Sequence, residues 1–271
     1  VDGLHRDVSC EEFFKMRREL SGHSLWQFSS SGLEGVEEGR WVGTSREEYS
    51  KSLMRTRRAW AARVLTERGR DFADGAGEEF AGVRVNEHLS DGNSECVRRF
   101  WRGLECVWLE QQEALEGDGD FECLGEFLQL SAEDVIGMGS FMWHGTDVGR
   151  IEEIFRWNFD PMQRGRGTGQ LYGIGEYFGE NAGECAAYAK NGPELILSFV
   201  LKGGHQKVVQ GVGVRVENPT NEAASFCLPL MSLSFSAAGW ENLRACRSPF
   251  DVENTVEKLS LSLSHTQREG G

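Results

Sequence analysis

Several features are scarce or missing in this chain of 271 residues, and each narrows the class of protein. The longest apolar runs, such as "LILSFVL" at 195–201, are too short to cross a membrane. The first residues show no basic stretch followed by an apolar one, so we expect no secretory signal. Lys and Arg number 29 against 43 Asp and Glu, which gives a net charge of −14. Because affinity for the phosphate backbone rests on basic side chains, we expect no binding to duplex DNA.

The cysteine pattern also argues against a disulfide framework and against a zinc site. The seven cysteines are odd in number, no two form a Cys-x-x-Cys pair, and no Cys/His grouping has zinc spacing. Reduced thiols are typical of the cytosol and the nucleus. We therefore expect a nuclear or cytoplasmic protein with no structural metal and no membrane partner.

Helical and extended patterns alternate along the chain, which predicts an α+β fold. Two basic clusters, "RTRRAWAAR" (55–63) and "RRFWR" (98–102), are interpreted as solvated helix faces in preference to basic pockets. Helices are predicted around 45–67 and at 104–117, 147–157 and 181–189. Strands are predicted at 139–145, within 193–204 and at 227–235.

The stretch from His144 onward has the chemistry of a ligand site. His144 at the end of a strand can hydrogen-bond a sugar hydroxyl, and Thr146 adds a protein hydroxyl nearby. Gly145 leaves its backbone N–H and C=O open to a ligand because it has no Cβ. A carboxamide needs one donor and one acceptor, which a glycine backbone supplies together.

Aromatic residues follow within reach of these groups. Their rings can stack on a flat heterocycle, and glycines between them allow a tight backbone; the residues are Tyr172, Gly173, Gly175, Tyr177 and Tyr188. An aromatic amide joined to a ribose is nicotinamide riboside, so the constellation predicts an NAD site. Each feature alone is more often a packing residue, and the run is not the Gly-x-Gly-x-x-Gly dinucleotide fingerprint. The prediction therefore rests on their occurrence together and in order.

The segment 141–189 resembles the catalytic core of the poly(ADP-ribose) polymerase (PARP) family of ADP-ribosyltransferases. The matching motifs are "WHGT" (143–146), "IFRWNFDP" (154–161), "YGIGEYF" (172–178) and Tyr188, eleven residues after Tyr177. The "NFDP" motif is most similar to the mono-ADP-ribosylating branch. The resemblance implies a split antiparallel β-sheet with helices, and NAD as substrate.

The resemblance also implies a role for each matching residue. His144 would hydrogen-bond the adenosine-side ribose with help from Thr146, and Gly145 would hold the nicotinamide amide. Tyr188 would stack on the nicotinamide ring, and Tyr177 would close the other side.

The resemblance also implies roles for further positions, and at one of them this chain has a different residue from the family. Arg164 or Arg166 would reach the pyrophosphate. Cys185 stands where the family usually has a serine that bonds the nicotinamide amide, and a thiol is a poorer donor. Chain-extending members use a glutamate on a later strand, for which Glu222 and Leu230 are the two candidate positions. We expect no catalytic glutamate, and hence transfer of single ADP-ribose units to protein side chains.

The amino-terminal half contains, in order, "LWQF" (25–28), "GRWVG" (39–43) with "EEYSKSL" (47–53), and "VNEHLSDGNSECVRRF" (85–100). These motifs resemble a WWE domain, whose ligand-binding arginine position is occupied by Glu95. Poly(ADP-ribose) or ADP-ribose is a possible partner of that domain, although a carboxylate repels phosphate. The expected organisation is a leader (1–22), a small α+β WWE-like domain (23–100), a PARP-like catalytic domain (101–235) and a polar tail (236–271). Two other functions stay open: a catalytically silent NAD- or ADP-ribose-binding interaction module, and an NAD glycohydrolase.

Overall fold

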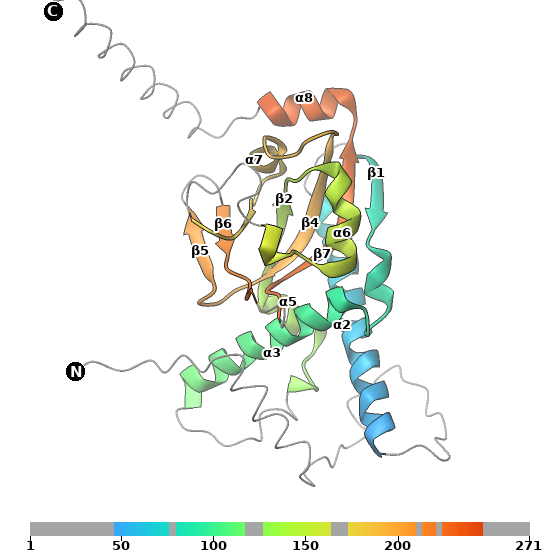
Figure 1. The fold of residues 1–271 in the computed structure, drawn as a ribbon, viewed down its shortest axis with the longest axis vertical. Helices are drawn as coiled ribbons and strands as arrows, with labels where there is room; N and C mark the ends of the chain where they lie inside the picture. Colours follow the sequence, from blue (N-terminus) through green and yellow to red (C-terminus); the bar gives the residue numbers. More distant parts are fainter. Residues whose placement is uncertain are drawn as a thin grey trace, which may run out of the picture.

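The computed structural model describes residues 46–75, 80–116, 127–163, 173–209, 213–220 and 224–245. These residues form helices and two antiparallel sheets, which confirms the predicted α+β class (Figure 1). The expected leader and residues 23–45 of the expected WWE-like domain lie outside the described residues.

The larger sheet has four antiparallel strands in the order β1-β7-β4-β2. Its two central strands are almost wholly buried, which explains why their sequences are mostly apolar on both faces. One face packs on the long helix α2, where Phe72 contacts Phe141 and Trp143. The other face packs on α6. The strands are β1 (Phe80–Val85), β7 (Cys227–Phe235), β4 (Glu194–Leu201) and β2 (Gly139–His144).

The smaller sheet has three antiparallel strands in the order β3-β6-β5. It joins the larger sheet through a bridge between Trp143 and Gly179, whose backbones exchange hydrogen bonds of 2.8 and 2.9 Å. This junction lies directly before His144. The strands are β3 (Glu176–Phe178), β6 (Gly213–Val216) and β5 (Gln206–Val209).

The predicted helices form, and two of them are longer than the sequence patterns indicated. α2 extends the helix expected at 45–67, and α3 begins nine residues before the expected residue 104. The described helices are α2 (Arg46–Gly75), α3 (Glu95–Glu116), α5 (Ala132–Gly137), α6 (Ile151–Trp157), α7 (Ala182–Ala186) and α8 (Ala237–Ala245), with 3-10 turns η2 (Glu87–Ser90), η3 (Val148–Arg150) and η4 (Pro161–Gln163).

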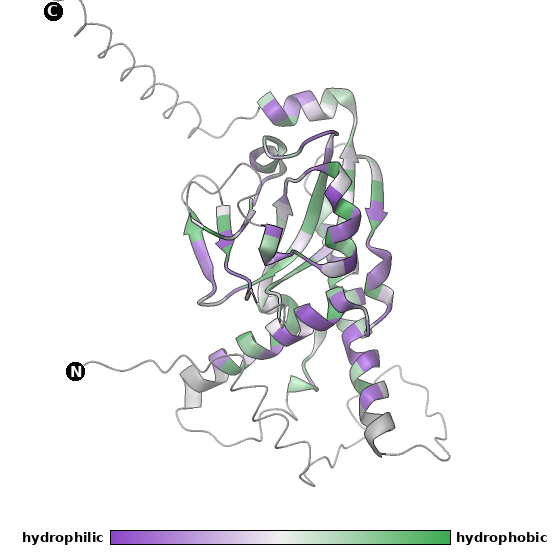
Figure 2. Cartoon of the chain, viewed as in Figure 1, coloured by the Kyte–Doolittle hydropathy of each residue, from purple (hydrophilic) through white to green (hydrophobic). Residues whose placement is uncertain are grey.

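The amphipathic pattern of α3 explains its place in the core. Its buried residues recur at the helical period and include Val97, Phe100, Leu104 and Val107. Figure 2 shows hydrophilic residues along the outside of α2 and α3 and hydrophobic residues within the sheet. No described helix is long and apolar enough to cross a membrane.

The expected boundary between residues 100 and 101 falls inside α3, so the described residues do not divide there. β1 pairs with β7 from Phe80↔Phe235 to Val85↔Met231, and one hydrophobic core includes residues from both expected domains. The pairing joins segments far apart in the chain, which local sequence patterns do not reveal. Residues 80–100 therefore belong to the same folded unit as the expected catalytic domain.

The expected polar tail begins with an ordered helix, α8. Ser236 starts this helix, because its Oγ accepts a hydrogen bond from Gly239 N at 3.0 Å. Leu243 is buried and Trp240 packs on Phe235. The expected tail therefore includes α8 over 237–245, while residues 246–271 lie outside the described part.

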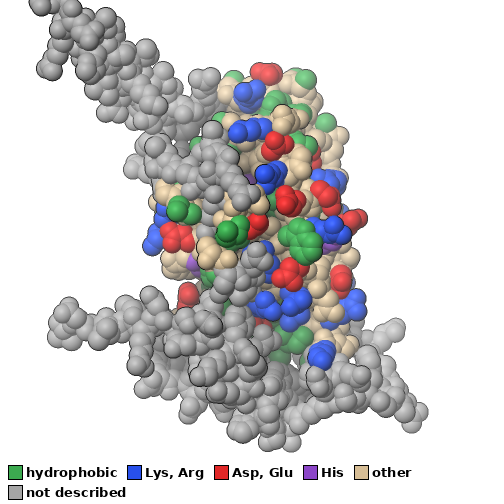
Figure 3. Space-filling view, in the orientation of Figure 1, with side chains coloured by type: hydrophobic (Ala, Val, Ile, Leu, Met, Phe, Trp, Pro, Cys, Tyr) green, Lys and Arg blue, Asp and Glu red, His purple; other side chains and the backbone are tan. Residues whose placement is uncertain are grey.

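The basic clusters are only partly solvated, which corrects the expectation of exposed helix faces. Arg57 and Arg99 are buried. Arg57 donates to the carbonyl of Leu130, and Arg99 donates to the carbonyl of Trp157 at 2.8 Å. The positive charge of Arg99 beside Trp157, the last residue of α6, also stabilises the carboxyl end of that helix. Elsewhere, on the face seen in Figure 3, acidic and basic side chains are interspersed.

Candidate functional site

The structure brings the two predicted motif segments together. Residues 143–148 lie beside residues 177–190, linked first by the Trp143–Gly179 bridge. Further along, Lys190 N donates to the carbonyl of Thr146 at 3.0 Å, and Val148 N donates to the carbonyl of Lys190 at 3.0 Å. The close pairing of "WHGT" with the segment that ends at Tyr188 therefore follows from backbone hydrogen bonds.

His144 ends β2, and its ring orientation is defined by a backbone contact. Its Nδ1 lies 2.8 Å from the carbonyl oxygen of Tyr177. Because a carbonyl oxygen can only accept, Nδ1 must carry the proton and Nε2 must hold a lone pair. Burial lowers the pKa of His144 to about 4. The ring is therefore neutral at pH 7, and its Nε2 can accept a hydrogen bond from a hydroxyl.

Two phenyl rings enclose the imidazole. The ring of Phe159 meets His144 edge-on with centroids 4.8 Å apart, and the ring of Phe178 lies 5.4 Å away. The two phenyl rings contact each other at 5.2 Å. Both phenylalanines are buried. This packing desolvates the imidazole and limits its rotation.

Gly145 and Cys185 are in close backbone contact. A Cβ on Gly145 would lie 2.0 Å from the carbonyl oxygen of Cys185, so only glycine fits there. The thiol of Cys185 is buried and donates to the carbonyl of Trp143 at 3.1 Å. Burial raises the pKa of this thiol to about 12. The thiol is therefore protonated and already engaged with the protein.

Tyr188 follows α7 at the surface. Its backbone nitrogen donates to the carbonyl of Cys185 at 3.0 Å, and the residue is 39% exposed. Tyr188 therefore lies three residues after Cys185, whose carbonyl also contacts Gly145. Asn181 stands at the N-cap position of α7 as predicted, but its side chain makes no capping bond.

Tyr177 belongs to a compact unit that includes a cation the sequence patterns did not single out. Its hydroxyl donates to the carbonyl of Gly173 at 2.6 Å, and Gly173 has φ +104°, which requires glycine. Arg215 pairs with Tyr177 across β3 and β6, and its guanidinium packs on Gly173 and bonds Glu217. The sequence feature that could have revealed Arg215 is its charge within the otherwise apolar alternation of "GVGVRVE" (211–217).

Leu230 does not reach this site. It is fully buried, and its Cδ1 lies 3.0 Å from the place of a Cβ on Gly69 of α2. On the opposite face of the sheet, Ile196, the register partner of His144, packs on α6. β4 also separates β7 from β2. The structure thus places Leu230 in the core against α2, and its role as a candidate position for the catalytic glutamate stays a prediction.

Four other predicted site residues lie outside the described part of the chain: Arg164, Arg166, Tyr172 and Glu222. Glu95, the expected departure in the WWE-like domain, is the first residue of α3. Its carboxylate lies 3.4 Å from the guanidinium of Arg98, as expected one helical turn away.

A buried polar network behind the site was also missed. Asn158 donates to the carbonyls of Cys227 and Cys96 and accepts from Ser225 Oγ. Ser225 Oγ also lies 3.4 Å from Asn218, which donates to the carboxylate of Glu176 at 3.0 Å. These residues lie far apart in sequence, so no local pattern predicts the network.

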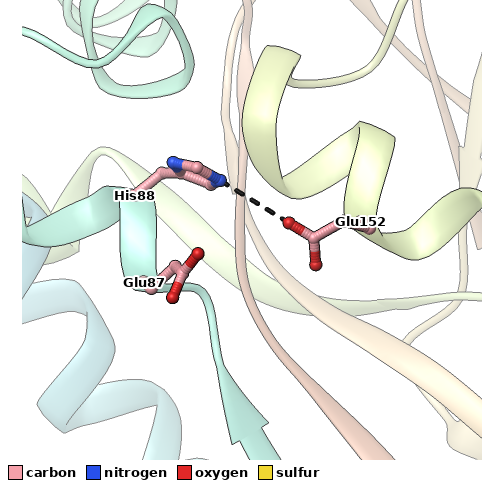
Figure 4. A group of neighbouring side chains, drawn as sticks. All are labelled: Glu87, His88 and Glu152. Atoms are coloured by element: carbon pink, nitrogen blue, oxygen red, sulfur yellow. Dashed lines mark ion pairs between the residues drawn. The ribbon is translucent and has the colours of Figure 1, made fainter.

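A second group of titratable side chains lies on the surface at η2 and α6. The ligand atoms of Glu87, His88 and Glu152 lie within 4.8 Å of one another, and His88 Nε2 is 3.7 Å from Glu152 (Figure 4). Arg84 already donates to the carboxylate of Glu152 at 2.9 Å. The ion pair of Glu152 with Arg84 already occupies one carboxylate of this group. The absence of a structural metal stays a prediction.

Comparison with known proteins gives no relative to transfer a role from. No protein-family model matches the chain, and no curated protein matches it.

Proposed function

We propose that the protein is an NAD-dependent protein mono-ADP-ribosyltransferase. The observation that carries the proposal is the neutral imidazole of His144, locked on the carbonyl of Tyr177 beside Gly145. This arrangement offers an acceptor to a ribose hydroxyl at the junction of two antiparallel sheets. We propose that these sheets form the split sheet of ADP-ribosyltransferases.

The reaction would be displacement at the anomeric carbon of the nicotinamide ribose. The bond to the nicotinamide nitrogen breaks and its electron pair neutralises the ring, while an oxygen of the acceptor forms the new bond to carbon. The site would orient NAD and exclude water. We expect transfer of single units to an acceptor that brings its own carboxylate.

A catalytically silent NAD- or ADP-ribose-binding module is the second candidate. The thiol of Cys185 donates to the carbonyl of Trp143, so it is not available to the nicotinamide amide. Gly145 also packs closely on the turn at Cys185. Both features favour weak or altered binding of the nicotinamide end over turnover.

Incubation with labelled NAD distinguishes the candidate functions. The purified protein, His144→Ala and His205→Ala would be incubated with labelled NAD, and protein-bound label and free nicotinamide would be counted. His205 is a matched control, because burial also lowers its pKa to about 4 and it contacts a backbone carbonyl, that of Leu201, at 2.9 Å. A transferase labels protein in the parent and in His205→Ala but not in His144→Ala.

Each other outcome assigns a different function. Nicotinamide release without protein label would indicate an NAD glycohydrolase. Equal and negligible signals in all three proteins would contradict the enzyme and leave the binding module.

A further inference from the structure

Asn158 has a backbone conformation that side chains rarely adopt. This residue ends α6 with φ 69° and ψ −178°. The region is populated almost only by glycine, and another residue there costs about 1–3 kcal/mol. Such a conformation persists only where the surroundings hold it in place. Glycine would fit without strain, so the side chain of Asn158 must contribute something glycine cannot.

Both polar atoms of the Asn158 side chain have hydrogen-bond partners within the protein. Nδ2 donates to the carbonyls of Cys227 at 2.9 Å and Cys96 at 3.3 Å. Oδ1 accepts from Phe159 N at 2.8 Å and from Ser225 Oγ at 3.1 Å. The residue is only 1% exposed. These bonds tie the end of α6 to α3 and to the start of β7, in a buried setting where each bond is strong.

The next residue, Phe159, links the fixed backbone of Asn158 to the candidate site. The amide of Phe159 is held by Asn158 itself, and the ring of Phe159 meets the imidazole of His144 at 4.8 Å. Phe159 is 3% exposed and also contacts Phe178. A shift of the peptide after Asn158 would therefore move one wall of the space that encloses the imidazole.

We propose that Asn158 is a positioning residue for His144. By holding the strained peptide before Phe159, it seats the phenyl ring that keeps Nδ1 of His144 on the carbonyl of Tyr177 and leaves Nε2 as the acceptor. The value of that acceptor for NAD rests on the proposed function. The orientation of the imidazole is a property of the protein alone and can be measured without a ligand.

The test compares Asn158→Gly with Asn86→Ala. Glycine accepts the backbone angles but removes all four hydrogen bonds of the side chain. Asn86 is a matched control, because it is also 1% exposed and donates to two buried carbonyls, those of Phe155 at 3.2 Å and Pro229 at 2.9 Å. Both changes remove buried hydrogen bonds, but only Asn158 holds the amide of Phe159.

The readout is the tautomer of His144 at pH 7, observed through the ring nitrogens by NMR, with His144→Ala to assign the signals. We expect one tautomer, protonated at Nδ1, in the parent and in Asn86→Ala, and a mixture of tautomers in Asn158→Gly. If Asn158→Gly keeps the single tautomer while losing as much stability as Asn86→Ala, Asn158 is only structural and the proposal is overturned.

Phe159→Leu provides a second variant if Asn158→Gly does not fold. It removes the phenyl contact with His144 and leaves the side chain of Asn158 in place, so it should give the same mixture of tautomers. A single tautomer in Phe159→Leu would overturn the proposal as well.

Titration with NAD then links the positioning to the proposed function. We expect the Kd of Asn158→Gly for NAD to rise about tenfold, the lower end of the loss seen when a residue that orients a metal ligand is removed, and that of Asn86→Ala to stay unchanged. If the parent protein binds no NAD, the proposed function fails, while the tautomer comparison still decides the role of Asn158.

Discussion

Replacing Gly145 by alanine tests whether the end of β2 must lie against the turn at Cys185. The added Cβ would stand 2.0 Å from the carbonyl oxygen of Cys185 and 3.1 Å from the backbone nitrogen of Ala189. Atoms in contact stay about 3.5 Å apart, so one backbone segment must move by more than about 1 Å. Overpacking against side chains costs about 1–3 kcal/mol. Because both neighbours here are backbone atoms, we expect a loss at the upper end, about 3 kcal/mol.

Urea unfolding of Gly145→Ala and Gly137→Ala would measure this loss. Gly137 ends α5, and a Cβ there would meet no atom within 4 Å. Its replacement by alanine should therefore be neutral or stabilise by up to about 1 kcal/mol through the unfolded chain. Equal unfolding midpoints for the two variants would refute the close contact between Gly145 and Cys185.

The remaining predictions concern acid stability, thiol reactivity and the core. Burial lowers the pKa of His144 and His205 from 6.5 to about 4, so their contribution to stability is complete above pH 6.5 and falls as the pH drops toward 4. Each imidazole should contribute up to about 2 kcal/mol to the loss of stability between pH 7 and pH 5. Urea titrations at the two pH values should show a smaller loss in His144→Gln and in His205→Gln. An unchanged loss in both variants would contradict the conclusion that the two imidazoles are buried in the neutral form. The thiol of Cys185, with a pKa raised to about 12, should react with a thiol reagent at pH 8 only after unfolding, and rapid labelling of native protein at this residue would show that it is not buried. Leu230→Ala should destabilise the protein by about 2–5 kcal/mol, because Leu230 is fully buried against α2, whereas a loss below about 1 kcal/mol would place it outside the core.

Local patterns in the sequence were sufficient for several elements of the fold. The continuous apolar run at 195–201 predicted the buried strand β4, and the run at 227–235 predicted β7. Asp147 was one of two expected caps, and its carboxylate does accept from Gly149 N at 2.9 Å. In each case the signal lies within a few residues, where periodicity and capping act.

Features that depend on distant contacts were not predictable in this way. The pairing of β1 with β7 joins Phe80 to Phe235. The early start of α3 had a local signal, because Ser94 Oγ accepts from Val97 N at 3.3 Å, but the resemblance to a WWE ending assigned that stretch to another domain.

The candidate site also has features that the sequence predicted and features that it did not. The order of the motifs and the family resemblance placed His144 and Tyr177 in one site, and the imidazole of His144 does lie on the carbonyl of Tyr177. They did not predict the contact of Phe159 with His144, or the position of Arg215 on Gly173. Both depend on how α6 and β6 pack in three dimensions, which the spacing of motifs does not encode.

Calorimetric titration of NAD into the parent protein, His144→Ala and His205→Ala tests the central claim most directly. The account predicts saturable binding of one NAD per chain in the parent and in His205→Ala, and a loss of at least about tenfold in affinity in His144→Ala, because a buried hydrogen-bond acceptor is removed. Absence of binding in the parent, or equal affinity in all three proteins, would contradict an NAD site at His144.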